Sequence, residues 1–121
     1  MTHNLNGKRI IVTGGAGFIG SMLVRHLLQA GADVHVVDNL INGKRENLAD
    51  ITSPDLHLHR VDIRDADSMH QLMQGTHLVY HLACLGVRHS IHSPIENHEV
   101  NATATLNLLM SAREADVERF V

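Results

Sequence analysis

The sequence predicts an α/β fold, a doubly wound parallel sheet with strand order 3-2-1-4-5, where strands are numbered along the chain. Strand-like and helix-like patterns alternate, which is typical of parallel strands joined by crossover helices. The glycine-rich stretch TGGAGFIG (13–20) stands between the first strand and the first helix. The first apolar run is continuous, as in a strand covered on both faces, whereas residues 56–62 alternate, as in an edge strand.

The first half of the chain predicts two strands and a helix. Residues 8–12 (KRIIV) are apolar and rich in β-branched side chains, which predicts the first strand. Residues 18–28 have helical spacing and are followed by a glycine stop at position 31. Residues 34–38 (VHVVD) predict the second strand, and residues 44–51 a short helix. The apolar positions of the first helix are Ile19, Met22, Leu23, Leu27 and Leu28.

The second half repeats the pattern. Residues 56–62 predict the third strand, 65–73 a helix that starts with aspartate, and 77–83 the fourth strand. A loop over residues 85–93 leads to the Ser93-Pro94 helix start, from which a helix extends to about residue 115. One face of that helix carries Val100, Ala104, Leu108 and Ser111. A fifth strand begins at Glu118, and we expect the chain to be cut within it.

Composition excludes several classes of partner. The formal net charge of -3 argues against nucleic acid and against an anionic membrane surface. The sequence has neither a signal-peptide pattern nor an apolar run long enough to span a membrane. The one cysteine, Cys84, allows no internal disulfide and is expected to be a small buried apolar side chain. These features predict a cytoplasmic protein.

No metal site is predicted, although the chain has eleven histidines. The best candidate ligands are His57 and His59, which would share one face of a strand. No cysteine or carboxylate pair completes a site with them. We therefore expect most histidines to lie on the surface.

The glycine stretch predicts a phosphate site. Gly14, Gly17 and Gly20 have GxxGxxG spacing between a strand and a helix. The first glycine permits a tight turn, the second lets the backbone approach a pyrophosphate, and the third lets helix and strand pack closely. The helix N-terminus presents free N–H groups and partial positive charge to the phosphates. The absence of a following Gly-Lys-Ser/Thr excludes a Walker nucleotide loop.

An acid at the end of the second strand favours NAD as the cofactor. Asp38 follows Gly20 by 18 residues, and a carboxylate there can accept hydrogen bonds from both adenosine ribose hydroxyls. It would repel the 2′-phosphate of NADP. Lys44 and Arg45 nearby could instead serve such a phosphate, and Asp38 could be a plain turn residue.

Five stretches together carry a resemblance to a known family: TGGAGFIG, Asp38-Asn39, Val61-Asp62-Ile63-Arg64, His81-Leu82-Ala83, and Asn101 with Thr103. On these residues the sequence resembles the extended short-chain dehydrogenase/reductase family. The subgroup it resembles is the NAD-dependent epimerases and dehydratases of nucleotide sugars, over about residues 8–121. The resemblance implies a Rossmann-like, NAD-binding domain over residues 1–121. The cofactor-binding residues it implies are Gly14, Gly17, Phe18, Ile19, Gly20, Asp38, Asn39, Asp62, Ile63, Leu82, Ala83 and Asn101.

Several of these residues have simpler explanations. Asp62 could cap the following helix, and Leu82 and Ala83 are expected in the core in either case. The family's catalytic Tyr-x-x-x-Lys is missing, because Tyr80 is followed four residues later by Cys84. We therefore predict no catalytic residue in this chain and expect the catalytic and substrate-binding part to follow it in a longer enzyme.

Three functional hypotheses remain. The first is the NAD-binding portion of a nucleotide-sugar epimerase or dehydratase, with a nucleotide sugar as the whole enzyme's substrate. The second is a non-catalytic NAD-binding sensor, and the third is a fragment that does not fold stably. The resemblance leaves a homodimer open.

Overall fold

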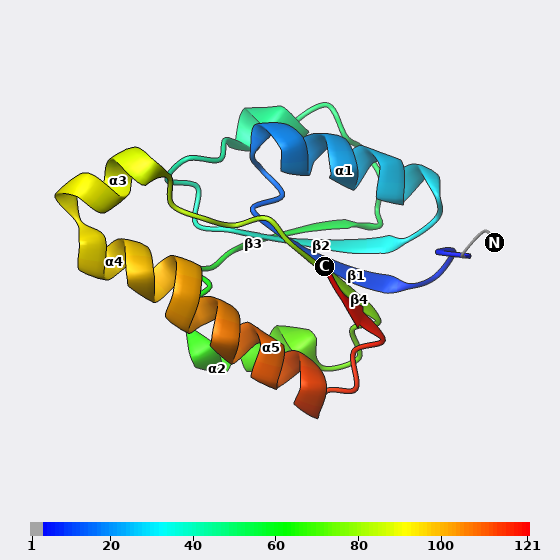
Figure 1. Ribbon diagram of the computed structural model, residues 1–121. Helices are drawn as coiled ribbons and strands as arrows, with labels where there is room; N and C mark the ends of the chain where they lie inside the picture. The colour runs from blue at the N-terminus through cyan, green and yellow to red at the C-terminus, as the bar shows by residue number, and fades with distance from the viewer. Residues whose placement is uncertain (1–3) are drawn as a thin grey trace.

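The protein folds into three layers, with a parallel five-stranded sheet between two layers of helices (Figure 1). The structure is a computed structural model and describes residues 4–121. The sheet has the order β3-β2-β1-β4-β5, and every neighbouring pair is parallel, which confirms the predicted topology. The strands are β1 (Arg9–Thr13), β2 (Asp33–Asp38), β3 (Leu56–Arg60), β4 (Leu78–His81) and β5 (Arg119–Phe120).

The helices cover both faces of the sheet. Helix α1 (Phe18–Gln29) lies on one face, and α2 (Ala66–Met73) and α5 (Ala104–Glu114) lie on the other (Figure 1). The remaining helical segments are the 3-10 helix η1 (Arg45–Leu48), α3 (Val87–His92), α4 (Pro94–His98) and the π-helical segment η2 (Glu99–Thr103).

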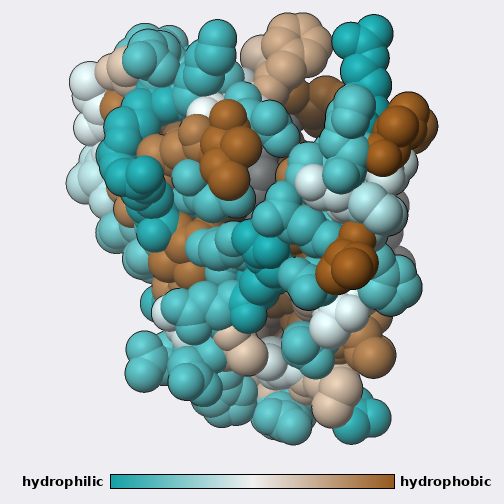
Figure 2. Space-filling model, turned by 90° about the vertical axis from the view of Figure 1, so that its left-hand side faces the viewer, coloured by the Kyte–Doolittle hydropathy of each residue, from teal (hydrophilic) through white to brown (hydrophobic). Residues whose placement is uncertain are grey.

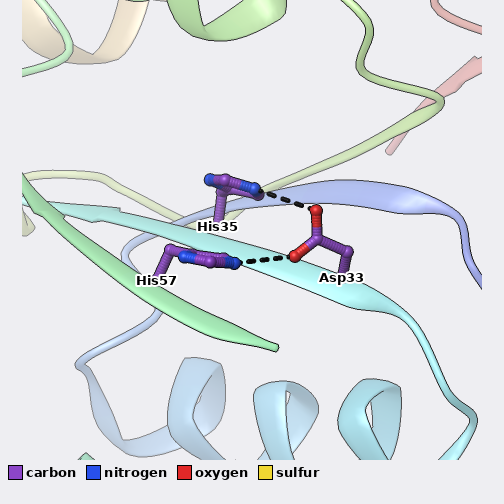
Figure 3. Close-up of side chains that lie close together, drawn as sticks. All are labelled: Asp33, His35 and His57. Atoms are coloured by element: carbon purple, nitrogen blue, oxygen red, sulfur yellow. Dashed lines mark hydrogen bonds and ion pairs between the residues drawn. The ribbon is translucent and has the colours of Figure 1, made fainter. Parts of the chain in front are cut away.

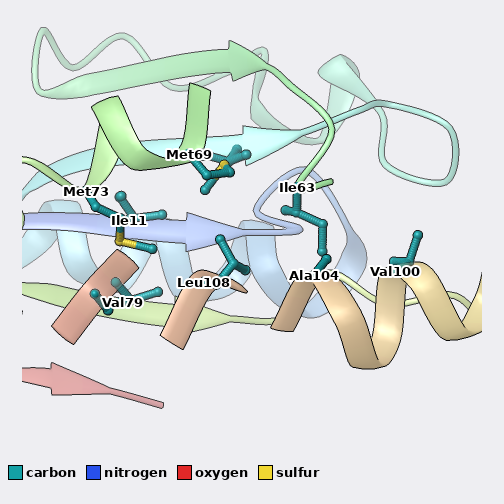
Figure 4. Close-up of a cluster of buried hydrophobic side chains, with 10 residues drawn as sticks. Ile11, Ile63, Met69, Met73, Val79, Val100, Ala104 and Leu108 are labelled. Carbon is teal, nitrogen blue, oxygen red and sulfur yellow. The ribbon is translucent and has the colours of Figure 1, made fainter. Parts of the chain in front are cut away.

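Each face of the sheet has its own hydrophobic core, because alternate residues of a strand point to opposite faces. Ile10 and Val12 of β1 pack beneath α1 with Val24 and Leu27 of that helix. Figure 4 shows the core on the other face, where Ile11, Ile63, Met69, Met73, Val79, Val100, Ala104 and Leu108 meet. Burial on both faces explains why the first strand is continuously apolar, as the sequence indicated.

The structure corrects the prediction for residues 85–115 in two ways. The segment 85–93, expected as a loop, contains helix α3, whose two large apolar side chains, Val87 and Ile91, are both exposed. The long helix is not uniform, because α4 leads through a π-helical turn into α5.

The buried faces of two helices also differ from the expected ones. In α5 the buried residue near the C-terminus is Ala112 rather than Ser111, four positions after Leu108. In α1 the buried face is built around Gly20 and Val24, and both Ile19 and Met22 are exposed. The other three predicted positions, Leu23, Leu27 and Leu28, do pack toward the core. The prediction fails only near the start of the helix, where Gly20 lies against the glycine backbone and no apolar side chain is buried.

Two further expectations were tested by the fold. The N-cap of α2 is Asp65, whose carboxylate accepts a hydrogen bond from the backbone N–H of Ser68, so the alternative role of Asp62 as the cap is wrong. Cys84 is exposed and not buried.

Within residues 4–121, no helix has both the length and the apolar character needed to cross a bilayer.

Candidate functional site

A cleft lies at the carboxyl ends of the strands, where β1 and β4 diverge toward helices on opposite faces of the sheet. Open α/β sheets bind ligands at such a point. Nine of the twelve predicted cofactor residues line this cleft: Gly14, Gly17, Phe18, Asp38, Asn39, Asp62, Ile63, Leu82 and Ala83. Ile19, Gly20 and Asn101 do not line it. The lining residues that the sequence analysis had not selected include Ile41, Gly43, Arg64, Leu85 and Glu96.

The glycine turn forms one wall of the cleft. Gly14 has φ +70, a conformation that favours glycine, and a Cβ there would lie 2.8 Å from the backbone nitrogen of Ala83. Gly17 is the N-cap of α1, whose first turn has no acidic side chain and no side-chain cap. Gly17 and Phe18 line the cleft, so the N-terminus of α1 lies beside it, and no acidic side chain of the first turn competes there for an anion.

Asp38 ties the glycine turn to the end of β2. One carboxylate oxygen accepts a hydrogen bond from the backbone of Ala16 (3.1 Å), and the other accepts one from Leu40 (2.8 Å). The hydrogen bond to Leu40 makes Asp38 a turn residue, which was the alternative explanation of this position. Asp38 also lines the cleft. A carboxylate offers about four acceptor sites, and two remain for a ligand.

Asp62 is held by an arginine that the sequence analysis had quoted but given no role. The guanidinium of Arg64 donates to both carboxylate oxygens, with Nη2 2.8 Å from Oδ2. These hydrogen bonds hold the pKa of Asp62 below its usual value, and the same contacts raise the pKa of Arg64. Nη1 of Arg64 lies 3.5 Å from Glu96 of α4. Arg64 thus bridges two sides of the cleft, from the β3–α2 loop to α4.

A hydrogen-bond chain, buried at Thr13 and more exposed toward Asn101, joins the ends of β1 and β4 to α5. The hydroxyl of Thr13 accepts from the backbone N–H groups of Leu82 (3.0 Å) and Ala83 (3.2 Å) and lies 2.6 Å from Nδ1 of His81. Nε2 of His81 lies 2.9 Å from the hydroxyl of Thr105, which donates to the Asn101 carbonyl. Burial lowers the pKa of His81, which favours the neutral ring. In that ring Nε2–H donates to Thr105 and Nδ1 accepts from Thr13.

Replacing Thr13 with valine is expected to lower the free energy of unfolding by about 1–3 kcal/mol, since it leaves the Ala83 N–H and Nδ1 of His81 without a partner in a buried site. Chemical denaturation of the variant measures this loss. Thr52→Val is the matched control, because Thr52 is exposed in a loop. Equal unfolding energies for the two variants would contradict the role given to the Thr13 hydroxyl.

Asn101 does not line the cleft but binds the loop that follows β4. Its amide accepts from the Leu85 N–H and donates to the Leu85 carbonyl, both at 2.8 Å. Leu85 lines the cleft, so Asn101 acts on the cleft through this loop. Leu82, which was expected in the core, is 38% exposed, and Ala83 is half-buried.

Figure 2 looks at this end of the molecule and shows brown apolar side chains among teal polar ones. Phe18 at the start of α1 is 87% exposed, and Ile41 beside the cleft is 71% exposed. Apolar side chains so placed around a cleft offer contact to the flat faces of a ligand or to further protein.

The strand order, the glycine turn at a helix N-terminus and the cleft at the switch point define a Rossmann-like nucleotide-binding fold. A model of the NAD dependent epimerase/dehydratase family matches residues 10–121. The chain belongs to this family.

Similar proteins carry several activities in their names. A putative UDP-glucose 4-epimerase from Methanocaldococcus jannaschii is 35% identical over 114 residues, which are 93% of this chain and 36% of that protein. A UDP-N-acetyl-alpha-D-glucosaminuronate decarboxylase from Bacillus cytotoxicus is 40% identical over 106 residues, 87% of this chain and 33% of that protein. The chain therefore spans about a third of the length of these curated relatives.

A solved structure agrees with the fold. The dTDP-glucose 4,6-dehydratase from Streptomyces venezuelae, crystallised with NAD and TYD bound, is 40% identical and superposes with a TM-score of 0.86. The match covers 93% of this chain and 38% of that one.

Proposed function

We propose that this chain is the NAD-binding portion of a nucleotide-sugar epimerase or dehydratase. The observation that carries the proposal is the cleft at the carboxyl ends of the strands, into which the glycine turn, Asp38 and Asp62 converge. The family match and an NAD-bound dehydratase among the similar structures support it.

The residues of the cleft fit a dinucleotide. Gly17 leaves the space that a side chain would fill at the helix N-terminus, where the pyrophosphate would contact the backbone N–H groups. Asp38 would accept hydrogen bonds from the adenosine ribose with its free acceptor sites. Asn39 would bind the same ribose, and Asp62 and Ile63 would flank the adenine. Leu82 and Ala83 would line the cofactor behind β4.

NAD is favoured over NADP by the charges at the end of β2. The carboxylate of Asp38 would repel a 2′-phosphate. Lys44 and Arg45, the candidates for a phosphate contact, are exposed and do not line the cleft.

Bound NAD would supply a hydride acceptor for transient oxidation of a sugar hydroxyl in the whole enzyme. This chain's residues would bind and orient the cofactor, with the loop that Asn101 holds lying next to its nicotinamide end. The catalytic base and the sugar nucleotide site would belong to other parts of that enzyme.

Thermal melts with NAD and with NADP at equal concentrations test the proposal. A ligand at about 100 times its dissociation constant adds about 2.7 kcal/mol to the stability of the folded state, so we expect NAD to raise the melting temperature clearly and NADP to raise it much less. Asp38→Asn is expected to reduce the difference between the two cofactors, since it removes the charge that repels the phosphate. A cooperative melt that neither cofactor moves would contradict the proposed function.

A further inference from the structure

A second polar cluster lies on the sheet face that carries α2, toward the amino ends of β2 and β3. Asp33 and His35 are two residues apart on β2, so both side chains project from the same face. His57 of β3 lies directly opposite His35 in the strand register. Figure 3 shows both imidazole rings directed toward the carboxylate of Asp33. None of these residues lines the cleft at the carboxyl ends of the strands.

The atoms of this cluster are arranged as metal ligands are. Nε2 of His57 lies 2.8 Å from one oxygen of Asp33, and Nε2 of His35 lies 3.2 Å from the other. One ligand atom from each of the three residues lies within 4.8 Å of the others. Because a carboxylate only accepts, each of these ring nitrogens donates a proton to Asp33 when no ion is bound, and an ion would replace those protons.

The two imidazole rings are stacked, with centroids 4.4 Å apart and an angle of 16° between their planes. Both Nε2 atoms face the carboxylate of Asp33 (Figure 3). Because the rings are nearly parallel, their Nε2 lone pairs converge on one ion only when His57 turns its ring toward His35. The His57 side chain is 43% exposed and that of Asp33 is 37% exposed, so the position is open to solvent and His57 is free to adjust its ring.

A third histidine supports the buried ligand. Nδ1 of His35 lies 2.9 Å from Nε2 of His59. When Nε2 of His35 bears an ion, its Nδ1–H can donate to Nε2 of His59, which would take the place of the carboxylate, carbonyl or water that metal-bound histidines usually contact. When no ion is bound, the Nε2–H of His59 donates to Nδ1 of His35 instead. The hydrogen bond between the two rings is therefore kept in the ion-bound and the ion-free protein, and neither ring has to move.

We propose that Asp33, His35 and His57 bind a divalent transition-metal ion, with Zn²⁺ as the preferred occupant. Two imidazoles and one carboxylate are a typical zinc donor set, and imidazole disfavours the hard ions Mg²⁺ and Ca²⁺. No metal site was expected at His57 and His59, because no cysteine or carboxylate pair completed it. In the structure the neighbouring strand β2 supplies one carboxylate, Asp33, and a further histidine, His35. The ion would link the edge strand β3 to β2, independently of NAD.

Titration of the untagged protein with Zn²⁺ by calorimetry, and with Co²⁺ followed by its visible absorption, tests the proposal. We expect one Zn²⁺ per chain at this cluster. His57→Gln and Asp33→Asn should each weaken binding at least about tenfold, since each removes a ligand. His92→Gln is the control, because His92 is an exposed histidine on α3 with no place in the cluster, and it should leave the affinity unchanged.

His59→Phe distinguishes binding of the ion at this cluster from binding by surface histidines elsewhere on the chain. It keeps a ring beside His35 but removes the acceptor, and it should weaken Zn²⁺ binding roughly tenfold. Melts recorded without metal establish that each variant is folded before its affinity is compared. The proposal is overturned if the wild type binds no Zn²⁺, or if folded His57→Gln binds it as tightly as His92→Gln does.

Discussion

Replacing Gly17 with alanine is expected to remove the NAD-dependent rise in melting temperature and to leave the melting temperature of the free protein nearly unchanged. The backbone at Gly17 (φ -78, ψ -179) is extended and suits any residue. A Cβ would meet only the carbonyl oxygen of Gly14, at 3.3 Å, which a small shift relieves. On its other side the same Cβ would occupy the space proposed for the pyrophosphate.

The expected loss of NAD affinity is large, because overfilling a close contact costs about 1–3 kcal/mol and each 1.4 kcal/mol is about tenfold in affinity. Thermal melts over a range of NAD concentrations measure it. Gly86→Ala is a closely matched control: Gly86 is also a helix N-cap with an extended backbone (φ -75, ψ 171), and a Cβ there meets nothing within 4 Å. An unchanged NAD response in Gly17→Ala would contradict the phosphate site at the start of α1.

Replacing Gly20 with alanine is expected to destabilise the protein itself, with or without cofactor. A Cβ at Gly20 would overlap the carbonyl oxygen of Gly14 and would lie 2.8 Å from Cα of Gly15. Both are backbone atoms of the turn, so α1 must move away from the sheet to make room. We expect a loss near the upper end of the usual overpacking cost, about 3 kcal/mol, and a melting temperature lower by roughly 10–20 °C.

Chemical denaturation and thermal melts of Gly20→Ala measure this loss directly, again beside Gly86→Ala. The two glycine variants should therefore lose different properties, the first cofactor affinity and the second stability of the fold. Gly17→Ala should be folded and deficient in binding, whereas Gly20→Ala should be deficient in folding. A Gly20→Ala protein as stable as the control would show that α1 does not depend on this close approach to the turn.

The topology was predictable because it depends on local patterns. Strand and helix spacing, the glycine turn and the single alternating strand at 56–62 were enough to place β3 at the edge of the sheet. Most of the cleft followed in the same way, since parallel strands bring their carboxyl ends together. Asp38, Asp62 and Leu82, from three different strand ends, line one cleft for this reason.

The features that were missed depend on contacts between distant residues. Thr13 and His81 are 68 positions apart, and only the pairing of β1 with β4 brings their side chains together. The Asp33 cluster likewise needs the exact register of β2 against β3, because a shift of one residue would turn His57 to the other face. Helix α3 was missed for a different reason, since it has only six residues and its one apolar pair, Val87 and Ile91, is too short a pattern to indicate a helix.

The π-helical turn at Glu99–Thr103 has a consequence for how this chain tolerates change. Such a turn holds one residue more than an α-helical turn. Removing that one residue would rotate α4 by about 100° relative to α5, because each residue of an α-helix turns the chain by about that angle. Helix α5 would keep Ala104, Leu108 and Ala112 in the core, but the amide of Asn101 would leave Leu85. A one-residue deletion here would therefore detach the loop beside the cleft and also turn Val100 away from the core that it shares with Ala104 and Leu108. At this segment the cleft and the hydrophobic core cannot be altered separately.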